Sequence, residues 1–173
     1  MNGTELHAAS VAAFARMLAN LSGCLDKAAA FAAEKKFDPD VLFVARLAPD
    51  MLTLTGQIHL ATAFAKNAAH RLAGTTPPNF TDLEPTLTAA RARIAETQGI
   101  LAAVKPADLE GGGAREITVQ LGPDRSMTAP GADYLSGFVL PNFYFHLTTA
   151  YAILRHNGVP LGKMDFMVPP PSA

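Results

Sequence analysis

The sequence predicts an all-α protein, an antiparallel four-helix bundle with a small β-hairpin between helices three and four. Four long segments place apolar residues at steps of three and four, the spacing of helices that bury one face. Proline and glycine separate these segments, and one short stretch alternates polar and apolar residues. At 173 residues the chain suits one domain, predicted over residues 1–168, followed by a flexible Pro-rich tail at 169–173.

Three helices are predicted before the hairpin. The first runs from about Thr4 to Lys36, and its apolar seam consists of Val11, Phe14, Leu18, Leu21, Leu25, Ala28 and Ala32. The second runs from near Asp50 to Gly74, a residue type that commonly ends helices. The third starts around Asp82, with Pro85 near its first turn, and ends before Pro106. Short links between helices favour antiparallel neighbours.

The hairpin and the last helix follow from the second half of the chain. Residues 116–121 alternate polar and apolar side chains and include β-branched residues, residues 122–124 have turn chemistry, and residues 126–128 form the expected returning strand. Pro130 opens the fourth helix, which is predicted to end at Asn157 with Gly158 as its cap.

Composition excludes several classes of function. A net charge of −1 without a Lys/Arg run argues against nucleic acid as a partner. No uncharged run approaches the roughly 20 residues of a membrane span, so no membrane is expected. Glu5 stands where a signal peptide would be basic, and the single Cys24 cannot form an internal disulfide. We therefore expect a cytoplasmic protein in which Cys24 is a buried, inert thiol.

Polar residues on the inward stripes are the candidate site. On the last helix, Asn142 and His146 lie one turn apart on a stripe that also contains Leu135, Val139, Ala150 and Ile153. On the second helix, Gln57 lies between inward-facing apolar residues. His59 is expected on the opposite, solvated stripe, together with Thr55, Thr62, Lys66 and His70.

The simplest interpretation of His146 is that it is a core histidine whose hydrogen bonds are satisfied by Gln57 and Asn142. Three inward polar groups nevertheless need one another, water, an ion or a ligand to offset the cost of burial. One imidazole and two amides make a poor site for a divalent transition metal. His146 could instead act as a general base, since a histidine in a dry pocket can titrate near neutral pH.

A second apolar stripe on the last helix consists of Leu140, Tyr144, Leu147 and Tyr151. A helix that is apolar on two sides is buried on two sides, and exposed aromatic stripes mark interfaces. The stripe therefore predicts a homodimer, with Tyr144 also a candidate wall of the ligand pocket.

The segments 140–146 (LPNFYFH) and 148–158 resemble the final helix of an uncharacterised bacterial family in the DinB/YfiT-like superfamily. Residues 45–51, 64–69, 71–74 and 162–166 add to this resemblance, which covers nearly the whole chain. The resemblance implies a four-helix bundle, commonly dimeric. It also implies a divalent metal, such as zinc or nickel, held by three histidines, and in some members metal-dependent transfer chemistry on small thiols.

Matched by position, His146 takes the place of the second metal-binding histidine on the last helix, and Asn142 takes the place of the first. Gln57 or His59 takes the remaining place on the second helix, and the helical phase favours Gln57. Three functions stay open. The first is a dimeric protein with a degenerate metal pocket, and the second is binding of a small ligand without turnover. The third is a divalent-metal-dependent thiol transferase or hydrolase that uses His146.

Overall fold

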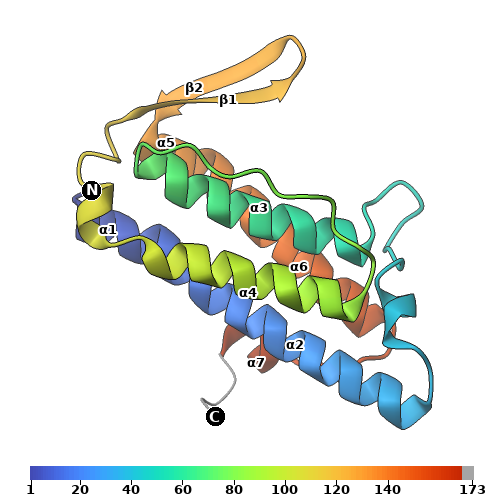
Figure 1. Ribbon diagram of the computed structural model, residues 1–173. Helices are drawn as coiled ribbons and strands as arrows, with labels where there is room; N and C mark the ends of the chain where they lie inside the picture. Colours follow the sequence, from blue (N-terminus) through green and yellow to red (C-terminus); the bar gives the residue numbers. More distant parts are fainter. Residues whose placement is uncertain (169–173) are drawn as a thin grey trace.

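The computed structural model describes residues 1–168, and most of these residues are helical (Figure 1). One two-stranded antiparallel sheet interrupts the helices between the third and fourth long helical segments. The predictions of a mainly helical fold and of a single hairpin at this place are confirmed. The predicted flexible tail, residues 169–173, lies outside the described residues.

The first long segment comprises α1 (Gly3–His7), a π-helical turn (Ala8–Ala12) and α2 (Ala13–Lys35). Asn2 caps its start, because its side-chain oxygen accepts from the backbone N–H of Glu5 over 2.9 Å. The Glu5 carboxylate accepts in return from the backbone N–H of Asn2, also over 2.9 Å. The segment ends at Lys36, which adopts the left-handed conformation with φ 59°.

This segment, Gly3–Lys35, is long and apolar enough to cross a membrane by length and composition alone. One such helix is weak evidence for a span, because the core helix of a packed protein passes the same test. Here Phe14, Leu18 and Leu25 are completely buried against the other helices.

The second long helix, α3, spans Leu54–Leu72. It begins later than the predicted Asp50, because Thr53 is the capping residue and accepts from the N–H of Gly56. A 3₁₀ turn, Pro39–Leu42, lies in the connection that precedes it. α3 ends at Leu72, and Gly74, with a φ of 74°, lets the N–H of Thr75 reach back to the carbonyl of His70 at 2.9 Å.

The third long helix, α4, spans Leu87–Ala103 and is followed by a 3₁₀ turn, Pro106–Leu109. It too begins later than predicted. The hydroxyl oxygen of Thr86 accepts from the N–H of Ala89 over 3.1 Å, so Thr86 is the cap and Pro85 precedes the helix.

α3 and α4 run in the same direction, which corrects the prediction of antiparallel neighbours. His59 contacts Arg93 near the start of both helices, whereas His70 and Ile100 line one cavity near their ends. Residues 73–86 pass back along α3 before α4 begins (Figure 1). At about 3.3 Å per residue this crossover can reach roughly 45 Å, more than the length of either helix.

Contacts at both ends of the helices also determine the relative directions of the other neighbouring pairs. α2 and α4 are antiparallel, since Arg91 bonds to Asp26 whereas His7 bonds to Val104. α3 and the last long segment are also antiparallel, since Gln57 bonds to His146 whereas Arg71 bonds to Tyr134.

The hairpin consists of β1 (Glu116–Gly122) and β2 (Arg125–Pro130). Thr118 and Thr128 lie opposite each other, and their hydroxyl oxygens are 2.8 Å apart. Ile117 and Val119 are buried, so one face of β1 belongs to the hydrophobic core. The hairpin extends from the end of the molecule at which the last long segment begins (Figure 1).

The last long segment comprises α5 (Gly131–Tyr134), a second π-helical turn (Leu135–Val139) and α6 (Leu140–His156). Gly158 follows it with φ 91°. A short helix that was not predicted, α7 (Lys163–Met167), then packs on α2. The side chain of Asn20 donates to the carbonyl of Phe166 over 2.7 Å, and Lys27 pairs with Asp165 at 2.6 Å.

The core lies between the four long segments. The Phe14 and Phe143 rings pack with centroids 4.7 Å apart, which joins α2 to α6. α3 and α6 pack along most of their lengths and bring the middle of α6 against the first half of α3. That contact places the candidate site.

Candidate functional site

Gln57 on α3 and His146 on α6 meet across the interface of their helices. Oε1 of Gln57 lies 2.8 Å from Nδ1 of His146, and the two side chains are 1% and 8% exposed. The amide nitrogen of Gln57 donates to the carbonyl of Leu52 over 3.3 Å. Because the amide nitrogen is engaged at Leu52, the oxygen of Gln57 faces the histidine.

This chain of hydrogen bonds determines the tautomer of His146. An amide oxygen can only accept, so Nδ1 of His146 carries the hydrogen and, in the neutral ring, Nε2 keeps a lone pair. Within residues 1–168, the hydrogen bond of the ring is the one at Nδ1, which leaves Nε2 without a protein partner in a side chain that is 8% exposed. Burial lowers the pKa of His146 below its usual 6.5, which keeps the ring neutral at pH 7.

Two aromatic rings flank His146. The ring of Phe64 stacks on the imidazole with centroids 5.8 Å apart and planes at 17°. The Phe145 ring meets it edge-on at 5.3 Å, and Phe145 is 56% exposed. His146 therefore stands at the edge of the core, between a packed ring and a solvent-exposed one.

Asn142 does not join this pair. Its amide nitrogen donates to the carbonyl of Phe138, one turn earlier on the same helix, over 2.7 Å. Asn142 is half-buried, and Phe143 takes the fully buried position that the sequence assigned to it. Both residues lie in the regular helix α6, whose buried face is centred on Phe143, Leu147 and Ala150 and leaves Asn142 farther from its centre than His146.

His59 points to the other side of α3, toward α4. Its Nδ1 accepts from the guanidinium of Arg93 over 3.3 Å, and its half-exposed ring lines a cavity of about 410 Å³ beside Asp82. Burial, and then the nearby Arg93 charge, lower the pKa of His59. The structure thus brings Gln57 to His146 and separates His59 from it.

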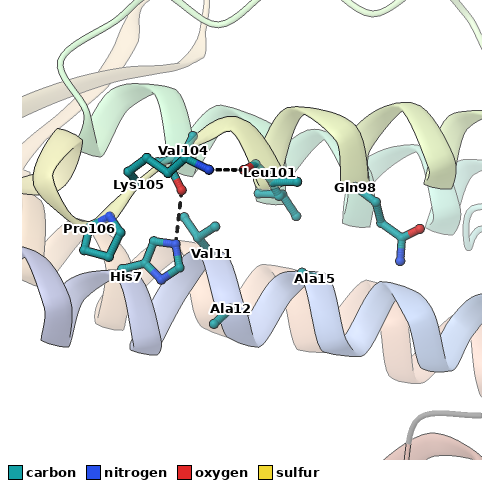
Figure 2. Close-up of a pocket in the computed structure, with 10 residues that line it drawn as sticks. His7, Val11, Ala12, Ala15, Gln98, Leu101, Val104, Lys105 and Pro106 are labelled. Carbon is teal, nitrogen blue, oxygen red and sulfur yellow. Dashed lines mark hydrogen bonds between the residues drawn. The ribbon is translucent and has the colours of Figure 1, made fainter. Parts of the chain in front are cut away.

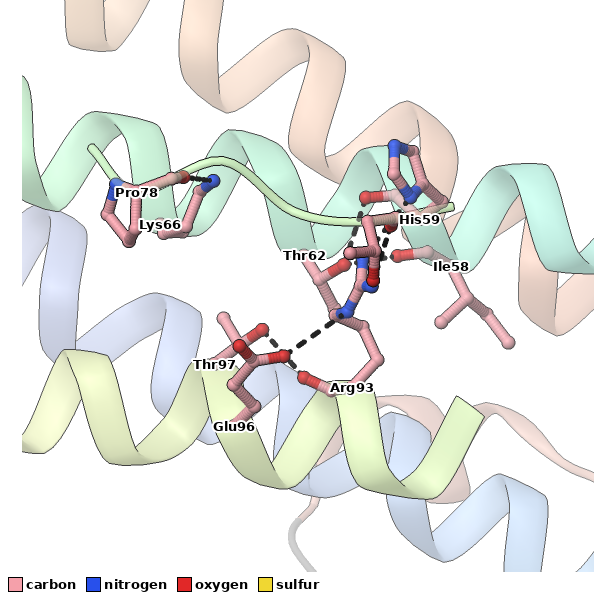
Figure 3. Close-up of polar contacts among 9 residues, drawn as sticks. Ile58, His59, Thr62, Lys66, Pro78, Arg93, Glu96 and Thr97 are labelled. Carbon is pink, nitrogen blue, oxygen red and sulfur yellow. Dashed lines mark hydrogen bonds and ion pairs between the residues drawn. The ribbon is translucent and has the colours of Figure 1, made fainter. Parts of the chain in front are cut away.

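The stripe of α3 that was predicted to be solvated is covered, which corrects that expectation. Thr62 is completely buried and Lys66 is 3% exposed, because α4 and the crossover lie over them. Lys66 donates to the carbonyl of Pro78 in the crossover, and Arg93 donates to the carbonyl of Thr81 over 2.8 Å (Figure 3). The sequence of α3 alone could not predict this burial, because it depends on a connection that comes later in the chain.

The ring of Phe80 holds the crossover, residues 73–86, against α3 and α4. The ammonium of Lys66 and the guanidinium of Arg93 lie 3.9 Å and 4.1 Å from the centroid of Phe80. Glu96 adds a charged partner for Arg93, at 3.4 Å from Nε (Figure 3). The two buried cations are thus offset by an aromatic face, two carbonyls and a carboxylate. The spacing of Lys66, Phe80, Arg93 and Glu96 in the sequence does not predict that they form a cluster.

Tyr144 lies away from His146. It is half-buried and lines a cavity of about 590 Å³ with Phe145, Leu47 and Met51. The rest of its predicted stripe is covered within the chain. Leu147 is 1% exposed, and Tyr151 packs edge-on against Phe166 of α7 at 5.7 Å.

His7 also has a defined partner at a cavity. Its Nε2 donates to the carbonyl of Val104 over 3.2 Å, at one end of a cavity of about 330 Å³ between the first long segment and α4 (Figure 2). Gln98 lies at the other end.

Residues 6–167 match the family model described as a domain of unknown function, DUF1993. The chain belongs to the DUF1993 family. A crystal structure of a DinB family member from Shewanella denitrificans is similar to it, with a TM-score of 0.89 and 38% sequence identity. The similarity covers 99% of this chain and 96% of that one, which identifies DUF1993 as a DinB-like family and confirms the resemblance. No curated protein matches the chain.

The residues of this DUF1993 protein do not fit the three-histidine metal site that the superfamily resemblance implies. Within residues 1–168, no three His, Cys, Asp or Glu side chains lie close enough together to hold an ion. Nδ1 of His146 is occupied by Gln57, and the amide of Asn142 is turned to its own helix. One imidazole nitrogen remains, which is too few strong donors for zinc or nickel.

Proposed function

We propose that this protein binds a small organic molecule at the surface between α3 and α6, with Nε2 of His146 as the hydrogen-bond acceptor. The observation that carries this proposal is the hydrogen-bond chain from Leu52 through Gln57 to His146. It holds the imidazole in one orientation and one tautomer, with the lone pair directed away from Gln57. Sites that recognise a ligand are positioned by such supporting contacts.

The surroundings of His146 indicate what the ligand should offer. A neutral Nε2 needs an N–H or O–H donor, and the exposed ring of Phe145 beside it suits a flat apolar group. The site has lost the residues that would bind a metal ion, and an organic ligand with its own hydrogen-bond donor takes the place of that ion. Zinc titration of protein purified without a nickel column should therefore give no stoichiometric uptake. Tight uptake that is lost in His146→Ala would contradict this.

Paired probes that differ in a single donor test the binding proposal. Indole and phenol each have the donor, whereas N-methylindole and anisole have the same rings without it. In ¹⁵N-labelled protein, indole and phenol should shift the His146 imidazole resonances, and the methylated compounds should not. His146→Phe should abolish the backbone amide shifts that indole causes at Phe145 and Leu147, whereas the matched change His156→Phe at an exposed histidine of α6 should leave them. Equal shifts from indole and N-methylindole would refute the proposal.

A hydrolase that uses His146 as general base is the second candidate. It is favoured by the same lone pair, because burial keeps the ring neutral while Nε2 has no protein partner among the described residues. Hydrolysis of p-nitrophenyl acetate above the buffer rate should then disappear in His146→Gln and persist in His156→Gln. Equal rates in the two variants would exclude a general base at His146.

We also propose that the cavity beside Tyr144 belongs to a homodimer face. Phe145 is 56% exposed and Leu47 is 41% exposed, so an apolar surface with an aromatic ring remains uncovered in the single chain. Light scattering should give a dimer mass that Leu47→Asp reduces to the monomer mass. A monomer mass for the unmodified protein at high concentration would refute the dimer.

A further inference from the structure

A separate cavity of about 470 Å³ lies at the ends of the parallel helices α3 and α4. α4 contributes Ile100 and Val104, α3 contributes His70, and the crossover contributes Thr75 and Pro78. Its volume is in the range of small-molecule sites, and most of its lining is apolar. None of the residues of the His146 site lines it.

His70 presents an acceptor here. Its Nδ1 lies 2.8 Å from the hydroxyl oxygen of Thr75, and that hydroxyl lies 3.2 Å from the carbonyl of His70. Both hydrogen bonds form together only if Thr75 donates to the carbonyl and Nδ1 donates to Thr75. In the neutral ring, Nε2 of His70 is then a lone-pair acceptor. Burial, and then the charge of Lys66, lower the pKa of His70 and favour this neutral form.

Asp108 supplies the negative charge of the cavity. It lies in the 3₁₀ turn after α4 and accepts from the backbone N–H of Lys105 over 2.8 Å. A carboxylate has several lone-pair positions, so capping this turn leaves others for a ligand. The polar side chains that line the cavity are therefore two acceptors and a threonine whose hydrogen is already used.

The helix directions add to this negative character. Because α3 and α4 are parallel, the carboxyl-terminal ends of both helices lie at this cavity, and each carries a partial negative charge. Two lysines and one arginine nearby oppose it. Lys66 is engaged with the carbonyl of Pro78 and the ring of Phe80, and the Lys105 ammonium donates to the carbonyl of Ala102. The guanidinium of Arg115 lies beside Gly74, so it reduces the negative potential at that end of the cavity without removing the Asp108 charge.

The cavity in Figure 2, on the other side of α4, differs in the hydrogen-bonding groups that line it. It is lined by Gln98 and Lys105, whose side chains bring N–H donors. The cavity at His70 has acceptors and a carboxylate. A ligand there must supply the donors, and a positive charge on it would be stabilised.

We propose that the cavity formed by His70, Asp108 and the apolar side chains between them binds a small organic amine. The ammonium group donates to the Asp108 carboxylate and to Nε2 of His70, and the hydrocarbon part lies against Ile100 and Val104. This site is independent of the surface at His146.

Three compounds of similar size test this assignment: 2-phenylethylamine, 2-phenylethanol and phenylacetate. In ¹⁵N-labelled protein at neutral pH, 2-phenylethylamine should give saturable shifts at Thr75, Ile100 and Val104, with a dissociation constant of about 1 mM. The alcohol should bind about tenfold more weakly, and phenylacetate should give no saturable shifts at these residues.

Matched variants test whether amine binding needs the charge of Asp108 and the space of the cavity. Asp108→Asn keeps a side-chain acceptor for the turn and should weaken amine binding about tenfold. Asp124→Asn makes the same change in the hairpin turn and should have no effect. Ala103→Trp, at an exposed cavity position, should fill the site and abolish binding. Unchanged affinity in Asp108→Asn, equal binding of amine and phenylacetate, no saturable shift with the amine, or shifts confined to His146 would each overturn the proposal.

Discussion

Oε1 of Gln57 accepts a hydrogen bond from Nδ1 of His146 across the interface of α3 and α6, over 2.8 Å. Both side chains are buried, and the surrounding interface is mainly apolar. Hydrogen bonds in such surroundings are costly to break, because the remaining partner has no water to replace it. The contact therefore contributes to stability as well as to the orientation of the imidazole.

Gln57→Ala should lower the free energy of unfolding by about 1–3 kcal/mol, because Nδ1–H of His146 would be left without its acceptor. Urea unfolding followed by circular dichroism measures this change. Gln98→Ala is the matched control, since Gln98 is a half-buried helical glutamine on α4. If both variants lost the same stability, the contact with His146 would not be the cause.

Stability should fall on mild acidification. Burial lowers the pKa values of His59, His70 and His146 below 6.5 in the folded chain. The unfolded chain then takes up protons first, so the stabilisation is complete above about pH 6.5 and is lost as pH falls through the lowered pKa values. The urea midpoint should be lower at about pH 5.5 than at about pH 7.5.

His146→Gln should make this pH dependence shallower, because one of the three groups is gone. A midpoint that stays constant or rises on acidification would contradict the prediction.

Periodicity and turn chemistry were sufficient to predict the long helices and the hairpin. They did not predict that α3 and α4 are parallel, because helix direction depends on what the connection can span. Residues 73–86 are long enough to return along α3, and Phe80 within them packs between Lys66 and Arg93. Neither fact can be read from the phase of one helix.

The same limit applies to the site. The inward phase of α3 predicted Gln57 correctly as an inward residue, since its own helix is regular from Thr53 onward. Asn142 was misplaced because the sequence stripe was centred on Asn142 and His146, whereas the buried face of α6 is centred on Phe143, Leu147 and Ala150. Fully buried Phe143 takes the predicted place of Asn142.

Cys24 should be unreactive while α7 stays on α2. The thiol is 2% exposed and donates weakly to the carbonyl of Asp165. Burial, and then the charge of Asp165, raise its pKa to about 11. An aromatic disulfide reagent at about pH 8 should therefore label Cys24 only after unfolding in urea.

Phe166→Ala should speed this labelling in the folded protein, because it removes the ring that packs against Tyr151 and holds α7 down. Met164→Ala changes a side chain on the same helix that is 65% exposed, and should leave the rate unchanged. Fast labelling of the unmodified protein would show that α7 does not cover the thiol.

Two glycines should respond to alanine in opposite ways. Gly99 lies on the exposed side of α4, and a Cβ there would meet nothing within 4 Å. Gly99→Ala should therefore stabilise the protein by about 0.5–1 kcal/mol, the helix-propensity difference between the two residues. At Gly131, where α5 begins, a Cβ would lie 2.0 Å from the carbonyl oxygen of Gly112.

Gly131→Ala must then separate the start of α5 from the segment before the hairpin, at a cost of about 3 kcal/mol or more. The hydrogen bond from the N–H of Gly131 to the carbonyl of Arg115, 2.8 Å long, holds the same two segments together and prevents cheap relaxation. Urea unfolding of both variants measures the two effects side by side. Destabilisation by Gly99→Ala would mean that α4 is covered there by another chain, and a neutral Gly131→Ala would mean that the base of the hairpin can move.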